Sequence, residues 1–153
     1  MPTPARREAA SLRALLRGRW DVVGVVALGG ALGSAARWLV NERLPHVMGT
    51  FPWSTLIENV TGSLLLGVLL GFVLEVWRPG RYVRAFLGTG VLGGYTTFST
   101  YTADVLALAR AGEGPQALVY LVGSLAGGLL AAWAGMMIVR VLVIRPGTLE
   151  RGA

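Results

Sequence analysis

Four long apolar runs constrain the fold of this chain more than any other feature of its sequence. They cover residues 22–40, 53–74, 82–109 and 116–139, and each contains at most two charged residues. A helix needs about 20 residues to cross the hydrocarbon core of a bilayer, which is about 30 Å thick. The runs therefore predict an all-α membrane protein with four transmembrane helices, forming one domain over residues 20–144.

The links between the runs are short and rich in turn-forming residues. A proline lies in or beside these links at Pro45, Pro52, Pro79 and Pro115. Because proline cannot continue a helix, each of these positions predicts a helix boundary. Four crossings joined by short links place both ends of the chain on the same side of the membrane.

The charged residues concern the membrane rather than a nucleic acid. All fourteen basic residues are arginines, the formal net charge is +6, and the arginines flank the apolar runs. Such flanking charge is typical of membrane orientation and of contact with anionic lipid headgroups. The chain has no cysteine, which excludes disulfides and thiolate metal sites, and its single histidine, His46, lies in a predicted loop.

The distribution of arginines predicts an orientation in the plasma membrane. Residues 1–19 form an arginine-rich tail with no convincing cleavage site, and residues 145–153 form a short second tail. Together with the link at 75–84 and Arg140 just after the fourth run, these tails carry eleven arginines, whereas the opposite links carry Arg43 and Arg110. Since basic residues stay in the cytoplasm, both termini are expected there.

The third run is too long and too polar for a simple span. Its 28 residues would form a helix of about 42 Å, and its middle contains Gly93 and Gly94 followed by five hydroxyl-bearing residues. We expect the helix to break between Gly93 and Thr97, which leaves backbone carbonyls in need of a partner. The alternative is a kinked, continuous helix in which the threonines bond to their own backbone.

Glycines recur at a spacing of four residues in every run. The pairs are Gly29/Gly33, Gly67/Gly71, Gly90/Gly94 and Gly123/Gly127. In lipid, such pairs allow helix backbones to approach closely. The pattern predicts a tightly packed bundle and does not indicate an activity.

Polar residues inside the second run are candidates for function, because an unpartnered polar group in lipid is costly. Thr55, Asn59 and Ser63 share one helical face. The Asn59 amide could hold an anion without carrying charge, or it could join two helices. Glu58 lies on a different face and could pair with an arginine such as Arg37.

Aromatic and hydroxyl side chains in the third and fourth runs could line the same path. Phe98 and Tyr101 are three residues apart, and their ring edges carry partial positive charge that could face an anion. Ordinary aromatic packing is the alternative. Tyr120 and Ser124 form a thin polar stripe on the fourth run. The runs contain no nucleotide-binding loop, nucleophile elbow or carboxylate pair, so an enzyme is not favoured.

Three motifs together resemble the Fluc family of fluoride channels, also called CrcB proteins. They are GGALGSAARW at 29–38, GTFPWSTLIENVTGSLLLG at 49–67 and GTGVLGGYTTFSTYTAD at 88–104. The resemblance extends over all four runs, with the motifs in the family's order and spacing. It implies an antiparallel dimer of four-helix subunits with a broken third helix, which lets fluoride leave the cytoplasm passively and so relieves its toxicity.

The resemblance also implies roles for individual residues. Residues expected along the fluoride path are Asn59, Phe98, Tyr101, Thr55, Tyr120 and Ser124. The backbone carbonyls of Gly93 and Thr96 would hold a structural sodium ion at the dimer interface, and Arg37 would be structural or near the pore vestibule. Two positions depart from the family: Tyr101 replaces a usual phenylalanine, and Asp104 replaces a usual glutamate.

Three alternatives follow from the same sequence. The arginine bias favours a single orientation, so we hypothesise a heterodimer with an oppositely oriented homologue in place of a homodimer. A small four-helix antiparallel drug or cation exporter would need a membrane-embedded carboxylate, for which Glu58 is the near-central candidate. A subunit that assembles with a partner but has lost its own pore is the third alternative.

Overall fold

The computed structural model describes residues 20–76 and 79–144, and every regular element in these ranges is helical. The predicted tails at 1–19 and 145–153 lie outside the described residues. The elements in chain order are α2 (Trp20–Arg43), α3 (Trp53–Gly71), η1 (Phe72–Val76), α4 (Arg81–Arg84), η2 (Ala85–Leu92), α5 (Gly93–Tyr95), α6 (Phe98–Arg110), α7 (Gly114–Val139) and η3 (Arg140–Ile144). The elements labelled η are π-helical and continue the α-helices beside them.

Among the described residues, three helices are long and apolar enough to cross a membrane. They are Trp20–Arg43, Trp53–Val76 and Gly114–Leu142, and they contain the predicted spans at 22–40, 53–74 and 116–139. The prediction of membrane-spanning helices is therefore confirmed for three of the four runs. The third run, 82–109, is divided into two shorter helical stretches, Arg81–Tyr95 and Phe98–Arg110, and neither is long enough to span alone.

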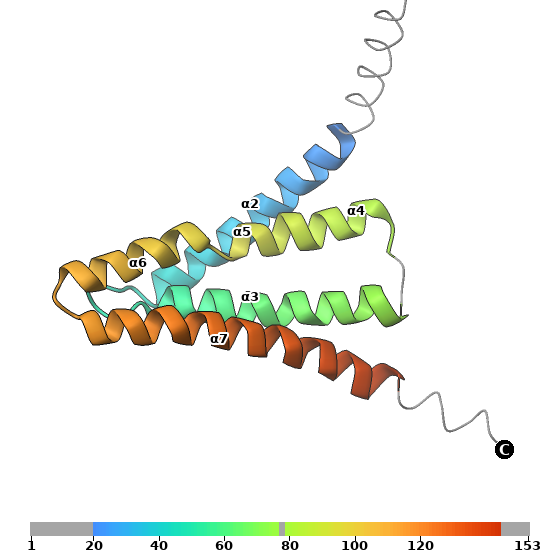
Figure 1. Ribbon diagram of the computed structural model, residues 1–153. Coiled ribbons are helices and arrows are strands. Elements are labelled where there is room, and N and C mark those ends of the chain that lie inside the picture. Colours follow the sequence, from blue (N-terminus) through green and yellow to red (C-terminus); the bar gives the residue numbers. More distant parts are fainter. Residues whose placement is uncertain (1–19, 77–78, 145–153) are drawn as a thin grey trace, which may run out of the picture.

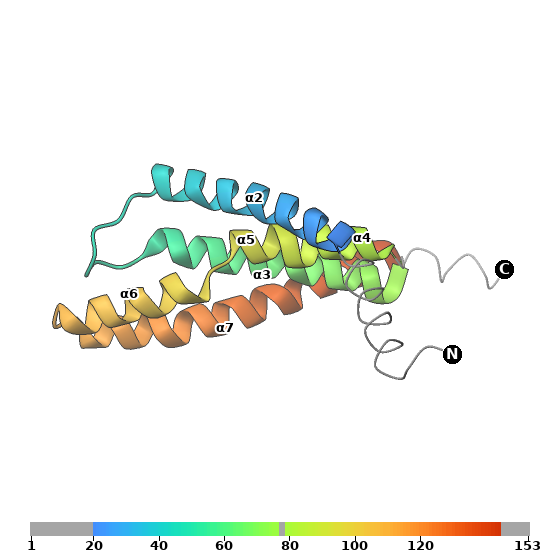
Figure 2. The same cartoon turned by 90° about the horizontal axis from the view of Figure 1, so that it is seen from above.

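The helices run up and down between two ends of the bundle, and α2 is inclined to α3 and α7 (Figures 1 and 2). The start of α2, the end of η1, the start of α4 and the end of η3 lie at one end, and the α2–α3 and α6–α7 connections lie at the other. We call these the tail end and the link end. Because Trp20 and Ile144 share the tail end, the described chain enters and leaves the bundle on one side.

The two stretches of the third run have different neighbours. Before the break, η2 and α5 pack on α2, and after it α6 packs mainly on α7. The largest helix–helix contact is between α3 and α7, which lie side by side in Figure 1. The break thus allows one segment to change partners partway along the bundle.

Glycines allow the closest approaches between helices. A Cβ on Gly33 would overlap the carbonyl oxygen of Val91, and a Cβ on Gly67 would overlap that of Ala132. These contacts confirm close packing for the predicted pairs on α2 and α3. Gly123 makes no such contact within the subunit, because a Cβ there meets no atom within 4 Å among the described residues.

Local signals in the sequence explain the sharp turn at the link end between α6 and α7. Gly112 has a φ of +83°, its N–H donates to the Ala109 carbonyl, and the Glu113 N–H donates to the Leu108 carbonyl. This is a Schellman ending, which satisfies the last carbonyls of α6. Pro115 then lies in the first turn of α7, where its missing N–H costs nothing.

Ion pairs join the helices at the tail end. Asp21 at the start of α2 accepts hydrogen bonds from Arg81 and Tyr82 at the start of the third run. Arg140 donates to Glu75, which joins η3 to η1. All these charged groups lie at the ends of the apolar stretches, where water can reach them.

Candidate functional site

The break in the third run is two residues long. Thr96 (φ −84°, ψ 158°) and Thr97 (φ −147°, ψ 126°) are extended, between α5 and α6. The predicted break is confirmed, and the alternative of a kinked but continuous helix is excluded. The two glycines remain helical, so the chain leaves the helix at the hydroxyl-bearing residues that follow them.

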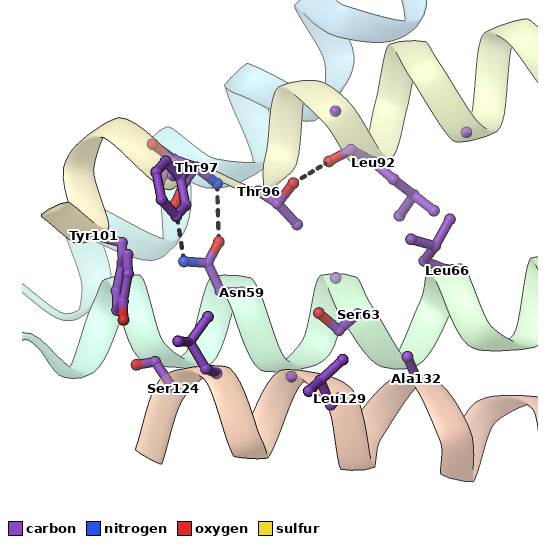
Figure 3. Close-up of a pocket in the computed structure, with 16 residues that line it drawn as sticks. Asn59, Ser63, Leu66, Leu92, Thr96, Thr97, Tyr101, Ser124, Leu129 and Ala132 are labelled. Atoms are coloured by element: carbon purple, nitrogen blue, oxygen red, sulfur yellow. Dashed lines mark hydrogen bonds between the residues drawn. The ribbon is translucent and has the colours of Figure 1, made fainter. Parts of the chain in front are cut away.

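Asn59 on α3 replaces the backbone partners that Thr97 loses at the break. The Asn59 Nδ2 group donates to the Thr97 carbonyl at 2.9 Å, and the Thr97 N–H donates to Asn59 Oδ1 at 2.9 Å (Figure 3). In a continuous helix the Thr97 N–H would donate to the carbonyl of Gly93. The amide side chain therefore holds the broken backbone against α3, and its second N–H is not used by these two bonds.

The threonines of the break satisfy the helix ends on either side. Thr96 donates both its N–H and its hydroxyl to the Leu92 carbonyl, each at 2.9 Å. The Thr97 hydroxyl oxygen accepts from the Thr100 N–H at 3.1 Å, as an N-cap of α6. The hydroxyl-rich stretch is thus explained first by the hydrogen bonds that a broken helix requires.

A pocket of about 490 Å³ opens beside the break, between α3, the third run and α7. Its polar lining comes from Asn59, Ser63, Thr96, Thr97 and Ser124. The Ser124 hydroxyl is buried and has no hydrogen-bond partner among the described residues. Figure 3 shows Asn59 and Ser63 projecting from α3 into this space, with Ser124 on the α7 side. An unpaired buried hydroxyl in an otherwise apolar pocket is available to a small polar guest.

The two aromatic residues after the break differ in their surroundings. Their ring centroids are 5.7 Å apart, and both rings line the pocket. Phe98 is 73% exposed in this chain, whereas Tyr101 is 4% exposed. The Tyr101 hydroxyl donates to the Leu121 carbonyl on α7 at 2.7 Å. The hydroxyl that Tyr101 carries, and that the phenylalanine expected from the resemblance would lack, is thus bonded to the backbone, and the ring remains part of the pocket lining.

Thr55 and Tyr120 lie one turn beyond the pocket, around Asp104. The Thr55 hydroxyl donates to Asp104 Oδ2 at 2.8 Å, and the Tyr120 hydroxyl lies 3.5 Å from the same oxygen. The Tyr120 and Tyr101 rings are 5.4 Å apart, which connects this buried polar cluster to the pocket. The polar stripe predicted on α3 is therefore divided, with Asn59 and Ser63 at the pocket and Thr55 at Asp104.

Glu58 and Arg37 lie away from the pocket lining. Glu58 is 1% exposed, and its Oε1 accepts from the Asn41 side chain at 2.8 Å. The same Asn41 amide donates to the Arg37 carbonyl at 3.0 Å. The expected pairing of Glu58 with an arginine is not confirmed, because within residues 20–76 and 79–144 none of its contacts is an ion pair. The Arg37 side chain is half-buried.

Comparison with known proteins identifies the family to which these features belong. The family described as "CrcB-like protein, Camphor Resistance (CrcB)" matches residues 24–136, which include the break, the pocket and the Asp104 cluster. The chain belongs to the CrcB-like family. Its resemblance to the Fluc or CrcB proteins is thereby confirmed.

Several curated proteins of this family share nearly half of their aligned residues with the chain. "Fluoride-specific ion channel FluC 2" of Streptomyces avermitilis is 45% identical over 124 residues, 81% of this chain and 78% of that protein. "Fluoride-specific ion channel FluC" of Nitrobacter winogradskyi is 45% identical over 125 residues, 81% of this chain and 99% of that protein. The protein of the same name from Rhizobium meliloti is 44% identical over 120 residues, 78% of this chain and 96% of that protein.

Sequence reasoning missed three contacts of this CrcB-like chain. They are the paired bonds of Asn59 to Thr97, the bond of Asn41 to Glu58, and the contact of His46 with Asp104 at 3.5 Å. The first and third join residues that are 38 and 58 positions apart. Helical periodicity carries no information on such distant pairs. The available signal was a polar residue within an apolar run. It indicated that a hydrogen-bond partner was needed, but it did not identify the partner.

Proposed function

We propose that this chain is a subunit of a channel that lets fluoride leave the cytoplasm passively and so relieves fluoride toxicity. The observation that carries the proposal is the pocket beside the helix break, where hydroxyl groups, an amide and aromatic ring edges converge. Membership of the CrcB-like family and the names of the relatives support fluoride as the permeating ion.

The lining suits an anion that passes through and is not retained. A small anion that enters a low-dielectric pocket must exchange water for donors, which here are the unused Asn59 N–H, the Ser124 hydroxyl and the Phe98 ring edge. None of the pocket-lining residues carries a positive charge. Conduction requires binding weak enough for release, and neutral donors meet that requirement better than an arginine or lysine.

In the bilayer, the two stretches of the third run together would form the fourth crossing of the bundle. Arg81–Tyr95 starts at the tail end and Phe98–Arg110 finishes at the link end (Figure 1). Non-helical backbone at membrane depth is tolerated where protein buries it, and Asn59 supplies that partner here. With four crossings, both termini lie on one side, and the arginine bias favours the cytoplasmic face of the plasma membrane.

We further propose that the pathway is completed by a second subunit in antiparallel orientation. Phe98 lines the pocket yet is 73% exposed, and Leu125 and Leu129 on the facing helix α7 are also exposed lining residues. A second chain that covers this side would enclose the pocket from lipid. The partner is either an identical chain or an oppositely oriented homologue, and the arginine bias favours the homologue. Comparable amounts of both orientations in topology mapping of the chain expressed alone would exclude that preference.

A sodium ion at the dimer interface would be held by the carbonyls of Gly93 and Thr96. Both residues fit this role, because the Thr97 N–H that would pair with the Gly93 carbonyl goes to Asn59, and Thr96 is itself extended. Unwound backbone in membrane proteins commonly supplies carbonyl ligands to sodium. When bound, the ion would compensate the carbonyl dipoles that the break exposes. Arg37 would remain structural or contribute to the vestibule.

The alternatives have less support. An exporter that exchanges protons for cations would need an accessible membrane carboxylate, whereas Glu58 is 1% exposed and bonded to Asn41. In a pore-deficient partner subunit, the pocket-lining residues of this chain would not contribute to fluoride flux. Substitution of those residues would therefore lower the flux of a conducting subunit and leave that of a pore-deficient subunit unchanged.

Fluoride flux from liposomes tests the proposal. Vesicles loaded with fluoride and holding this chain, alone or with a neighbouring homologue, are expected to release fluoride without a proton gradient or added substrate. Protein-free vesicles give the background. Release that needs a proton gradient and a cationic substrate would indicate an exporter. Release by the pair that is unaffected by Asn59→Ala in this chain would indicate a pore-deficient subunit.

A further inference from the structure

The chain's single histidine lies over a buried acid at the link end. His46, on the connection between α2 and α3, has its Nε2 atom 3.5 Å from Asp104 Oδ1 on α6. Its Nδ1 atom is 3.4 Å from the Ser54 hydroxyl at the start of α3. The His46 side chain is 21% exposed, and that of Asp104 is 9% exposed. The imidazole therefore stands between water and the carboxylate.

Asp104 is connected on its other side to the pocket. Its Oδ2 atom accepts from Thr55 and is approached by Tyr120, whose ring packs on Tyr101. Tyr101 lines the pocket and precedes Asp104 by one helical turn. An anion that leaves the pocket toward the link end would thus pass close to this carboxylate.

Few other ionisable groups surround this pair. Glu58 on α3 is within electrostatic range of Asp104, and Arg37 on α2 is within range of Glu58. Tyr120 is the ionisable group that α7 contributes. Within residues 20–76 and 79–144, His46 is the only basic group within 4.0 Å of the Asp104 carboxylate. Asp104 consequently has one basic neighbour in contact with its carboxylate.

The chemistry of the imidazole matches this position. Histidine is the side chain whose charge ordinarily changes between about pH 5 and 8. A neutral ring can donate from Nε2 to Asp104 and accept the Ser54 hydroxyl proton at Nδ1. A protonated ring keeps the contact with Asp104 and adds a positive charge. The same two contacts are compatible with both states, because the protonated ring can donate to Asp104 and to the Ser54 oxygen, while the net charge of the pair changes from −1 to 0.

We propose that His46 is the charge partner of Asp104 and that its protonation removes the negative charge which an anion meets at the link end of the pathway. This inference rests on the proposed fluoride conduction. Lower pH should then raise passive fluoride flux, because repulsion between Asp104 and the passing anion is cancelled. For one unit charge within several ångströms of the ion, the expected change is about three- to tenfold.

The pH dependence of flux in reconstituted vesicles tests this inference. Wild-type flux, after subtraction of the flux through protein-free vesicles at the same pH, should rise about three- to tenfold between about pH 8 and pH 6. His46→Gln keeps a donor toward Asp104 and an acceptor for Ser54, but it cannot gain charge. Its flux should stay near the wild-type value at high pH throughout. Glu113→Gln, an exposed acid at the same end, is the control and should retain the wild-type profile.

A second variant locates the effect at Asp104. The double variant Asp104→Asn/His46→Gln should conduct at the high rate over the whole range, because no carboxylate remains to be neutralised, and Asp104→Asn should conduct at no less than that rate at every pH. Size-exclusion profiles of all variants establish that each one assembles. If the double variant instead keeps the low rate of His46→Gln, the carboxylate is not the group through which His46 acts, and the inference is overturned.

The remaining outcomes separate this inference from the proposed function. Wild-type flux that does not change with pH, or a His46→Gln profile that rises like wild type, would overturn the inference and leave fluoride conduction standing. Absence of passive flux at every pH, with and without a homologue, would overturn the proposed function and the inference with it.

Discussion

The helices of this protein are held together in two different ways in two regions of the bundle. Around the α2–η2 and α3–α7 crossings, glycines such as Gly33 and Gly67 place backbone directly against backbone. At the break and beyond it, side chains make the connections, as in the Asn59–Thr97 and Thr55–Asp104 pairs. Backbone contacts leave no room for adjustment, whereas hydrogen-bonded side chains leave space between helices. The glycine-packed region thus fixes the frame, and the polar region can hold a pathway.

The largest expected effect is on assembly, and it comes from a substitution in the glycine-packed region. Gly33→Leu should prevent assembly, because the new side chain must displace the backbone at Val91 and no flexible neighbour can yield. We expect at least about a tenfold loss of monodisperse protein in detergent, measured by size-exclusion chromatography. Gly24→Leu on the same helix is the matched control, since a Cβ there meets no atom within 4 Å. Equal yields of the two variants would contradict backbone-to-backbone packing.

The next effect removes the central connection of the polar region. Asn59→Ala leaves the N–H and carbonyl of Thr97 without partners, at about 1–3 kcal/mol for each group. We expect at least about a hundredfold fall in fluoride flux in liposomes and a lower melting temperature. Asn59→Asp keeps the acceptor for the Thr97 N–H but places a negative charge in the pocket. It should retain more stability than Asn59→Ala and still lose flux, and a conducting Asn59→Asp would argue against an anion path at this residue.

A smaller effect is expected at Phe98, and it distinguishes a residue that lines the pathway from one that stabilises the fold by packing. Phe98→Leu should lower flux about tenfold while the unfolding free energy of the single subunit changes by less than about 0.5 kcal/mol, because the ring is 73% exposed within one chain. Flux and thermal unfolding of the same preparation give both values. Leu106→Ala, at another exposed position on α6 that does not line the pocket, should change neither. A loss of stability that matched the loss of flux would assign Phe98 to packing.

The smallest effect concerns the departure at Tyr101. Tyr101→Phe removes the bond to the Leu121 carbonyl, which is expected to cost about 1 kcal/mol of unfolding free energy. Because the ring stays in place, flux should remain within about threefold of wild type. Denaturation in detergent and liposome flux measure the two quantities. A large gain in flux would mean that the hydroxyl obstructs the path, contrary to its bonding in the structure.

Features that depend on local sequence were predictable. The three long helices follow from continuous apolar composition, and the break follows from glycines and hydroxyl-bearing residues at a depth where leucine is expected. The position of the break was predicted to within a few residues, but the helix continues through Gly93 and Gly94 and ends at Tyr95. Those glycines serve instead as contact points; Gly94, for example, lies against Gly30 of α2.

Features that depend on distant partners were not predictable. Asn59 was a functional candidate because of its depth and the family resemblance, yet its bonds to Thr97 need a register between two helices that no periodicity supplies. For the same reason the sequence offered an arginine as one possible partner of Glu58, and the structure instead places Asn41 there. Gly123 has the spacing of a packing residue, but nothing among the described residues lies opposite it. Spacing identifies a face of a helix and does not identify what covers it.

The bonds from Asn59 to Thr97 have a consequence for biogenesis. The stretch from Thr96 to Thr102 is a poor candidate for entering the bilayer unaided, because the N–H and carbonyl of the extended Thr97 would reach lipid unpartnered. The amide that resolves this is made 38 residues earlier on the ribosome. The second hydrophobic segment, which carries Asn59, is therefore already synthesised when the third segment emerges. Its amide can bond to the Thr97 backbone as soon as the third segment enters the bundle.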